Sequence, residues 1–290
     1  MLTQLIVSGL ATGCLYALVA LGLVIVYKAS NVLNFAQGDM AMVSTFVTFT
    51  LLETLHIPFF WAVLLAIVGA FLLGALFEIC LLRPVKHPTP LGLIIITVGA
   101  QQILYGVAGW IWGYDTKAFP SLLSDLKIYR FGALVISEVN LWILIASVLL
   151  MLALLLFFRY TRLGIAIRAM SQNLITAKLM GVSAHWTLSL TWGIASVLGA
   201  VAGILIAPIT FLDPNMMLNP LLKAFAAATL GGMNSFAGAV VGGGSLGILE
   251  NLVGGYLTPE LKESVAFLII ILVLCVRPSG LLGRHYKHRV

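Results

Sequence analysis

A few polar side chains interrupt otherwise apolar stretches of this sequence, and chemistry is expected there. Asn34 and Gln37 lie in one polar segment of the chain. Gln101 and Gln102 sit inside an apolar run, with Thr97 about one helical turn before them. Polar groups at membrane depth are costly and usually face protein or a water-filled route. We therefore predict that these five residues line a polar route through the protein.

Three ionisable side chains also fall in or beside apolar runs: Glu78, Lys223 and Glu250. Glu78 is five residues from Arg83, and Glu250 lies near the end of its run. We expect both carboxylates to reach water at a membrane interface, because a charge at the membrane centre costs roughly 2.5–3.5 kcal/mol on insertion scales. The long aliphatic chain of Lys223 is expected to carry its ammonium outward to water.

The sequence lacks the residue combinations that most enzymes and cofactor sites need. It has no GxxxxGK[ST] phosphate-binding loop, no catalytic Ser/His/Asp arrangement and no metal-ligand cluster at membrane depth. No apolar run carries an Asp/Glu/His series typical of a proton relay. The cysteines Cys14, Cys80 and Cys275 lie far apart in apolar runs and are expected to be free thiols. We therefore predict neither an enzyme nor a bound metal or cofactor.

The composition excludes a water-soluble fold. Of 290 residues, 61% are hydrophobic and only 9% are charged, whereas soluble proteins carry roughly 25% charged residues. So few charges cannot solvate a surface, which excludes a soluble enzyme, a disordered chain and a nucleic-acid-binding domain. The 16 basic and 10 acidic residues leave a formal charge of +6, and the placement of basic residues reports topology in membrane proteins.

We predict an all-α polytopic membrane protein, built as a single domain over 1–290 with eight to nine transmembrane segments. A helix needs about 20 apolar residues to cross the hydrocarbon. The segment 221–230 is too short for this and is predicted to be a half-helix, followed by a Gly-rich run at 236–253. The N-terminal run is expected to be a retained span, because no small-residue cleavage site follows it. The candidates for full spans are residues 7–27, 38–56, 59–82, 90–112, 139–158, 184–208 and 262–277.

Two polar segments, 30–39 and 213–220, each follow a long span that is rich in small residues. Irregular backbone at membrane depth is tolerated only where it is buried in protein or lines a cavity. Because the two preceding spans run in opposite directions in the predicted topology, the pattern is typical of an inverted repeat with broken helices. Ordinary polar loops at the membrane interface are the alternative.

Small residues recur at helical spacing in two of the apolar runs, at 193–203 and 238–247. Such faces let helix backbones approach closely. We expect these faces to pack helices together, either within the chain or between two chains.

Basic residues cluster in three connections, at 83–89, 159–183 and 277–290. The loop at 113–138 instead balances basic and acidic residues. Because basic loops remain on the cytoplasmic side, we expect the C-terminus in the cytoplasm and the N-terminus outside.

The longest of these connections contains a predicted surface helix at about 165–181. Ala169, Asn173, Ala177 and Met180 recur every three or four residues, and Gly181 is a plausible helix end. The helix either lies at the membrane interface or docks in the groove of a partner protein.

Several motifs occur in order along the chain, at 16–22, 34–38, 83–85, 223–232, 238–243 and 277–283. Together with the 165–181 segment they resemble the permease subunits of branched-chain amino acid ABC importers, over essentially the whole chain. The match is closer to the shorter of the two permease types. Two departures are Gln37, where the family often has His, and Gln172 or Asn173, where it often has an acidic residue.

The resemblance implies an ATP-driven importer subunit of the bacterial cytoplasmic (inner) membrane, working by alternating access. It implies a second permease subunit or second copy, two cytoplasmic ATP-binding subunits and an extracytoplasmic substrate-binding protein. The substrate would be a branched-chain or other neutral amino acid, although related permeases carry urea, short amides or aromatic acids. A secondary transporter without ATPases and a channel-like facilitator are the rival functions. The residues implied to couple the ATPases are Arg168, Ala169, Gln172, Asn173, Ala177, Lys178 and Gly181.

Overall fold

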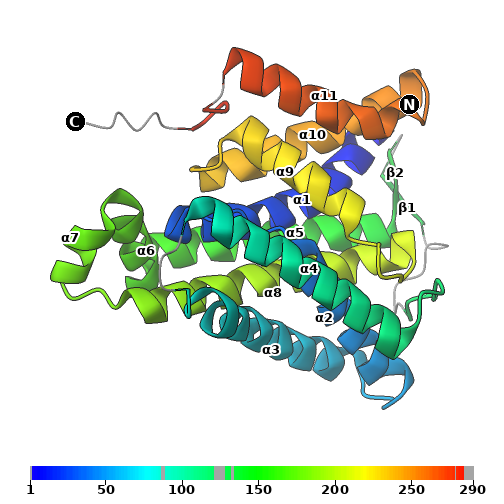
Figure 1. Cartoon of the computed structure of the whole chain (residues 1–290). Helices are drawn as coiled ribbons and strands as arrows, with labels where there is room; N and C mark the ends of the chain where they lie inside the picture. Colours follow the sequence, from blue (N-terminus) through cyan, green and yellow to red (C-terminus); the bar gives the residue numbers. More distant parts are fainter. Residues whose placement is uncertain (1, 86–88, 121–127, 132–133, 278, 284–290) are drawn as a thin grey trace. The chain divides into compact units, whose positions relative to one another are not determined.

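The computed structural model of the chain describes residues 2–85, 89–120, 128–131, 134–277 and 279–283 (Figure 1). Most of these residues are helical, which confirms the predicted all-α class. A small antiparallel hairpin, β1 (Ile128–Phe131) and β2 (Leu134–Ser137), lies in the predicted loop at 113–138. The helices are α1 (Leu2–Ser30), α2 (Gln37–Glu53), α3 (Phe59–Phe77), the π-helical turn η1 (Glu78–Leu82), α4 (Pro90–Trp112), α5 (Glu138–Tyr160), α6 (Arg162–Gln172), α7 (Leu174–Leu179), α8 (Ala184–Thr210), α9 (Leu218–Gly231), α10 (Phe236–Tyr256) and α11 (Leu261–Val276).

Six helical stretches in the described part of the chain are long and apolar enough to cross a membrane. They are α1, α3 with η1, α4, α5, α8 and α10. The predicted spans at 38–56 and 262–277 correspond to α2, with 17 residues, and α11, with 16 residues. Both are shorter than the roughly 20 residues of a full crossing. The predicted count of eight to nine segments is therefore not confirmed.

The contacts of the chain divide it into two compact units. Unit 1 comprises Met1–Val24, Leu123–Met151 and Leu221–Val290, and unit 2 comprises Ile25–Leu122 and Leu152–Pro220. Helices α1 and α5 each contribute one end to either unit. The two units are described separately below.

In unit 2, α2, α3 and α8 lie side by side (Figure 1). Phe77 stacks on Trp192, with ring centroids 5.3 Å apart. Gly74 abuts the Trp192 carbonyl and the Ser196 side chain, so a larger residue there would clash. A Cβ added to Gly199 of α8 would lie 2.9 Å from the Gln37 side-chain amide nitrogen of α2. The small residues of α8 therefore pack helices within the chain, as one of the two predicted alternatives states.

In unit 1, α1 and α10 meet through glycines. A Cβ added to Gly13 would lie 2.7 Å from the Gly243 carbonyl oxygen, and one added to Gly9 would lie 2.8 Å from that of Gly247. Atoms essentially never approach that closely, so only glycine fits at these crossings. The small-residue face at 238–247 thus also serves packing within the chain.

The first predicted break in the helices is present but shorter than expected. Helix α1 continues to Ser30, and Asn31 then adopts the left-handed conformation with φ 55°. Helix α2 begins at Gln37, so the non-helical backbone covers 31–36 rather than 30–39. Asparagine tolerates this conformation better than most residues, which explains where the helix stops.

The second break follows α8, where Phe211 has φ 65°. Helix α9 starts at Leu218, so the predicted half-helix at 221–230 is longer than expected by one short turn. Pro220 is compatible with this first turn, because the N–H that proline lacks has no helical partner there. With 14 residues, α9 rises roughly 21 Å, which is less than the hydrocarbon thickness.

The single surface helix predicted at 165–181 is two helices, α6 and α7. Asn173 interrupts them with φ −157° and ψ 108°, and its Oδ1 accepts a hydrogen bond from the Thr176 N–H at 3.0 Å. The asparagine therefore caps the start of α7 instead of continuing α6. Gly181 has φ 88°, and the N–H groups of Gly181 and Val182 close a Schellman motif on Lys178 and Ala177. The predicted glycine end is confirmed.

Candidate functional site

The break between α1 and α2 brings together three of the five predicted route residues. Asn34 Nδ2 donates to Gln37 Oε1 at 3.0 Å, and Gln37 Nε2 donates to the Ala195 carbonyl of α8 at 2.7 Å. Thr97 Oγ1 on α4 lies 3.2 Å from the Leu33 carbonyl and 2.8 Å from the Ile94 carbonyl. All three side chains are buried. They satisfy polar groups of the break and join it to α4 and α8.

One polar atom of this cluster has spare capacity. The Asn34 Oδ1 is buried and has no hydrogen-bond partner among the residues that the structure describes. A buried acceptor without a partner costs about 1–3 kcal/mol. The cluster is thus a place where a water or a polar solute group gains a hydrogen bond.

The structure does not place Gln101 and Gln102 in this cluster. Both continue α4 beyond Thr97, but Gln101 is half-buried and Gln102 is exposed on the helix surface. An exposed amide at membrane depth is favourable only beside water or another protein surface. The route role of these two residues stays a prediction.

A buried ion pair in unit 1 was missed by the sequence analysis. Lys223 Nζ of α9 lies 2.6 Å from Glu250 Oε1 of α10, and the two side chains are only 13% and 3% exposed. The expectation that Lys223 extends outward to water is therefore wrong, as is the expectation that the Glu250 carboxylate reaches water. The ammonium and the carboxylate stabilise each other inside the protein, where they are largely shielded from bulk water.

Two further groups complete this ionic cluster. The Lys223 ammonium also contacts Tyr16 of α1, at 3.3 Å from the hydroxyl and 5.4 Å from the ring centroid. Lys262, in the first turn of α11, lies 3.9 Å from the same Glu250 oxygen. The cluster therefore ties together four helices of unit 1. A lysine and a glutamate in neighbouring apolar segments were the signal that could have revealed it.

A second ion pair, in unit 2, forms locally. Glu78 Oε2 lies 2.8 Å from Arg83 Nη2 and accepts a hydrogen bond from Ser189 Oγ at 2.6 Å. The π-helical turn η1 makes this possible, because its i→i+5 bond, from the Arg83 N–H to the Glu78 carbonyl, brings residues five apart together. Glu78 is buried, so its predicted exposure to interfacial water is wrong.

The segment predicted to couple to a partner has both buried and exposed members. Ala177 packs against Met170 and Ala184, with Ala169 beside them. The exposed apolar side chains are instead Leu179 and Met180, at 82% and 81%.

The polar members of the segment lie near its surface. Arg168 folds back to donate to the Gly164 and Arg159 carbonyls, each at 3.2 Å. The remaining predicted members, Gln172, Asn173, Lys178 and Gly181, are exposed.

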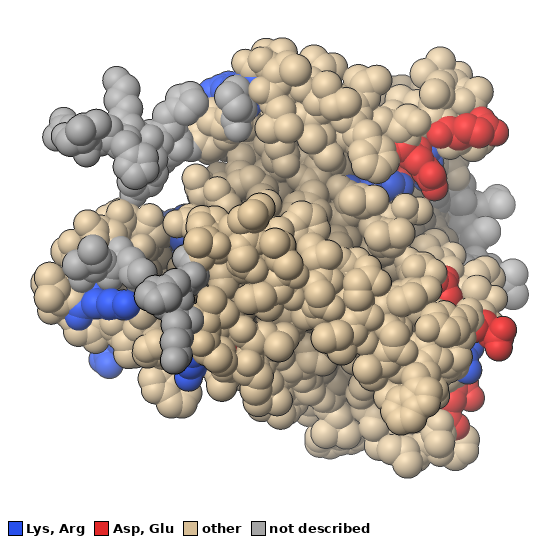
Figure 2. All heavy atoms as spheres, viewed as in Figure 1, with Lys and Arg blue, Asp and Glu red and all other residues tan. Residues whose placement is uncertain are grey.

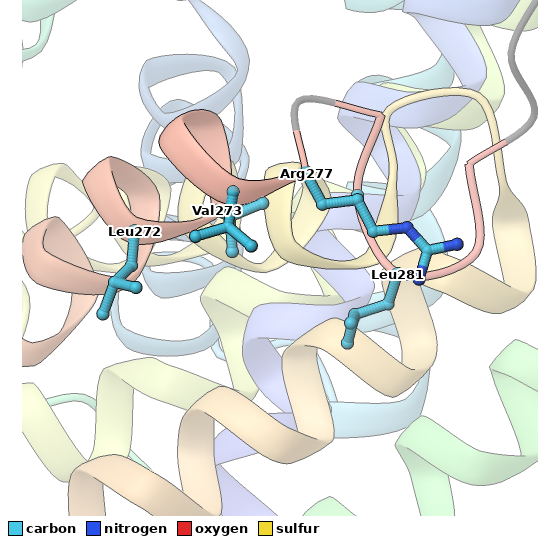
Figure 3. A pocket seen from close by; sticks show the side chains of 6 residues that line it. Leu272, Val273, Arg277 and Leu281 are labelled. Carbon is cyan, nitrogen blue, oxygen red and sulfur yellow. The ribbon is translucent and has the colours of Figure 1, made fainter.

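A notch of about 250 Å³ lies at the end of α11 in unit 1 (Figure 3). Leu272 and Val273 line it from the helix, and Arg277 and Leu281 line it from the following loop. Its lining is mainly aliphatic. It offers little to hold a polar ligand in one orientation.

Comparison with known proteins decides the family. The family profile described as "Branched-chain amino acid transport system / permease component" matches residues 5–274. The high-affinity branched-chain amino acid transport system permease protein LivH of Salmonella typhimurium is 34% identical, over 99% of this chain and 97% of that protein. The corresponding permease protein BraD of Pseudomonas aeruginosa is 32% identical over the same shares.

The chain belongs to this permease family. A probable branched-chain amino acid transport permease of Methanocaldococcus jannaschii is 30% identical over 94% of the chain. The fold also resembles a solved structure described as PsaBC from Streptococcus pneumoniae in complex with Fab, with a TM-score of 0.53. That likeness covers 96% of this chain and 92% of the other, at 12% identity, and so speaks for the fold alone. The family match over residues 5–274 and the nearly full-length relatives confirm the resemblance to the branched-chain permeases.

The charges of the permease separate along unit 2. Figure 2 shows Lys and Arg side chains of this unit mainly at the end that carries α6 and α7, whereas Asp and Glu side chains predominate at the opposite end, where some Lys or Arg is also visible. At the first end, Arg83 follows η1, Arg159 lies at the end of α5 and Arg162 begins α6. At the other end, Glu53 ends α2, and Asp115 and Lys117 follow α4. A wide uncharged surface lies between the two ends. This is the pattern of a multi-pass membrane protein.

Proposed function

We propose that this chain is the membrane-embedded permease subunit of an ATP-driven importer for branched-chain or other neutral amino acids. The observation that carries the proposal is the nearly full-length match to LivH and BraD, two permeases of branched-chain amino acid transport systems. The partners would be a second permease subunit or second copy, two cytoplasmic ATP-binding subunits and an extracytoplasmic binding protein.

The basic end of unit 2 would face the cytoplasm, because basic loops remain on that side of the membrane. This assigns α6 and α7 to the side where ATP is hydrolysed. The N-terminus would lie outside, and the C-terminus in the cytoplasm. Cysteines introduced at Thr3 and at His288 of a variant without Cys14, Cys80 and Cys275 report the side of each terminus through a membrane-impermeant thiol reagent. Labelling of both from the same side would contradict this topology.

Coupling would take place through the surface of α6 and α7. The exposed side chains Leu179 and Met180 can enter an apolar groove of an ATPase, while Arg168 and Lys178 meet acidic groups at its rim. Ala169 and Ala177 would support this surface from beneath, since they pack inside the permease. Closure of the ATPases on ATP would then move α6 and α7 and open the route to alternate sides.

The amide residues would divide into two roles along the route. Asn34, Gln37 and Thr97 would hold the break between α1 and α2 and offer the free Asn34 acceptor to a passing solute. Gln101 and Gln102 would line the route from α4, because an exposed amide there needs a polar neighbour. Uptake should fall when both are changed to alanine, while assembly of the complex stays intact.

Transport in proteoliposomes tests the proposed function. The permease, its partner subunits and the binding protein are reconstituted, and uptake of labelled leucine, urea, a short amide and an aromatic acid is measured. Leucine uptake that needs ATP and the binding protein supports the proposal. Uptake driven by a sodium or proton gradient without ATP would identify a secondary transporter, and downhill flux without either would identify a facilitator.

A paired substitution tests the coupling surface. The Leu179→Glu/Met180→Glu variant should lose the ATPase in pull-down and lose ATP-driven uptake, because an unpaired buried charge costs several kcal/mol. Trp186→Glu is the matched control, since it places a charge on an exposed residue in the first turn of α8. If the paired variant retains the ATPase and normal uptake, α7 is an interfacial helix without a coupling role.

A further inference from the structure

Unit 2 encloses a cavity of about 350 Å³ at its basic end. The walls come from the end of α1, from η1 and the loop after it, from the start of α4, from α6 and α7, and from the start of α8. Cavities of about 300–1,000 Å³ are the usual size of small-molecule sites. The cavity borders the break at Asn31 and Val32, the Glu78–Arg83 ion pair, and Lys178 of the proposed coupling surface.

The walls of the cavity carry a net positive charge. Lys28, Arg83 and Lys178 line it, and Glu78 is the only acidic residue among its lining residues, so their formal charges sum to 3 − 1 = +2. The Glu78 carboxylate is already held by Arg83 and Ser189. His185 adds an exposed imidazole. The cavity therefore favours a ligand that bears an anionic group.

The remaining lining is apolar and partly aromatic. Trp192 is fully buried and stacks on Phe77, which fixes its indole ring. Leu82, Leu93 and Leu188 also line the cavity. A mainly apolar wall with a few converging polar groups is the usual design of a small-molecule site.

The end of α1 supplies acceptors for a cation. Residues 28–32 line the cavity, and α1 ends at Ser30. The last carbonyls of a helix have no partner within the helix and carry its partial negative charge. The carbonyls of this last turn, which also carries Lys28, can accept hydrogen bonds from an ammonium group. Cationic side chains, helix-end carbonyl acceptors and an apolar wall thus all line one cavity of the size of a small molecule.

We propose that this cavity is a binding site for the carried neutral amino acid on the cytoplasmic side of the permease. The carboxylate is held by the Lys178 ammonium and the His185 imidazole, the ligand ammonium lies toward the end of α1, and the aliphatic side chain lies toward Trp192 and Leu188. This inference rests on the proposed function for the class of ligand and for the cytoplasmic location of the basic end.

Occupancy of the cavity has a consequence for transport. Met170 and Ser171 of α6 and Lys178 of α7 form one wall, so a ligand there restrains the two helices assigned to coupling. A ligand that binds one conformation better than another shifts the equilibrium toward it. When the amino acid accumulates in the cytoplasm, it therefore occupies this cavity and slows further uptake.

Direct binding is the first test. The assembled transporter without its binding protein is held in nanodiscs, and saturable binding of labelled leucine is measured. The wild type should bind leucine, and Ser171→Trp should abolish binding by filling the cavity. Lys178→Ala should weaken binding by about two- to fivefold, as expected for a partly exposed charge. Arg162→Ala is the matched control, because Arg162 is an exposed cation at the same end that does not line the cavity.

Transport into preloaded proteoliposomes is the second test. Internal leucine should reduce the initial rate of ATP-driven uptake in the wild type and in Arg162→Ala, and Lys178→Ala should need more internal leucine for the same reduction. Elution as a single symmetric peak in size-exclusion chromatography shows whether each variant is folded, and each reduction is expressed relative to the same variant's uptake without internal leucine.

The outcomes separate this inference from the proposed function. Normal ATP-driven uptake without leucine binding and without an effect of internal leucine overturns the inference and leaves the proposed function standing. Absence of ATP-driven uptake in the wild type overturns the proposed function itself. Leucine binding that is unchanged in both Ser171→Trp and Lys178→Ala places the site elsewhere. Displacement of leucine by glycerol phosphate at equal concentration identifies a lipid headgroup site and also overturns the inference.

Discussion

Glu78 and Glu250, the two carboxylates that are buried in the described part of the permease, are neutralised in different ways. In unit 1, Glu250 takes its cation from another helix, 27 residues earlier in the chain, and both partners are almost completely enclosed. In unit 2, Glu78 takes its cation from Arg83, five residues later, and the arginine side chain remains 34% exposed. The first pair connects two different helices, α9 and α10. The second pair stabilises the end of one helix, η1, and its contact with the neighbouring helix α8.

The difference lies in what happens when a partner is removed. A charge left alone inside a protein has neither water nor a counter-charge, whereas a charge near the surface regains water. The cations Lys223, Arg83 and Arg168 form a series of increasing exposure, at 13% and 34% for the first two side chains, with Arg168 classed as exposed. Substitutions along this series test whether enclosure decides the effect.

Lys223→Met is expected to have the largest effect. It leaves the Glu250 carboxylate buried, with Lys262 at 3.9 Å as its remaining cation. Removing one partner of a buried pair costs about 3–5 kcal/mol. The free energy of unfolding, measured by chemical denaturation of the purified permease in micelles, should fall by about that amount.

The double variant Lys223→Met/Glu250→Leu is the control for this prediction. Apolar residues often replace a buried ion pair with no loss of stability, so the double variant should unfold close to the wild type. If it is as unstable as Lys223→Met, the loss comes from the shape of the lysine rather than from the unpaired carboxylate. Equal stability of the single variant and the wild type would show that the enclosed pair contributes nothing.

Glu78→Gln should have an intermediate effect. The glutamine can still accept the hydrogen bond from Ser189, and Arg83 keeps its contacts to Ser189 Oγ at 2.6 Å and to the His185 carbonyl at 3.4 Å. Hydrogen bonds to charged groups contribute about 1.5–3 kcal/mol, and part of this remains in the variant. We expect a loss of about 1 kcal/mol in the same denaturation experiment. A loss as large as that of Lys223→Met would show that exposure does not distinguish the two pairs.

The long helices could be predicted from the sequence because their apolar runs exceed the thickness of the hydrocarbon. The break after α1 was also visible, since polar residues at 30–39 interrupt two such runs. The number of crossings could not be predicted, because hydropathy cannot separate a full span from a shorter apolar helix such as α2, with 17 residues, or α11, with 16.

The candidate site was less predictable than the fold, because its contacts depend on how distant helices align. The pairing of Lys223 with Glu250 depends on the turn between α9 and α10, where Gly232 has φ 106°. Local patterns identify the polar residues but not their partners. The cap at Asn173 shows the same limit within a single segment, because helical spacing continues through 165–181 although the backbone does not.

Arg168→Met should have the smallest effect of the series, and it separates stability from coupling. Arg168 is exposed, and its contacts within the described chain are hydrogen bonds to the Gly164 and Arg159 carbonyls. A surface charge is worth about 0–1 kcal/mol, so the free energy of unfolding should stay within that range of the wild type. ATP-driven uptake should fall by about two- to fivefold, because the same guanidinium is proposed to meet an acidic group of the ATPase. Arg168→Lys keeps the charge and should retain more of the uptake. A drop in stability comparable to that of Lys223→Met would instead mean that Arg168 holds α6 to the end of α5, and its assignment to the coupling surface would then be wrong.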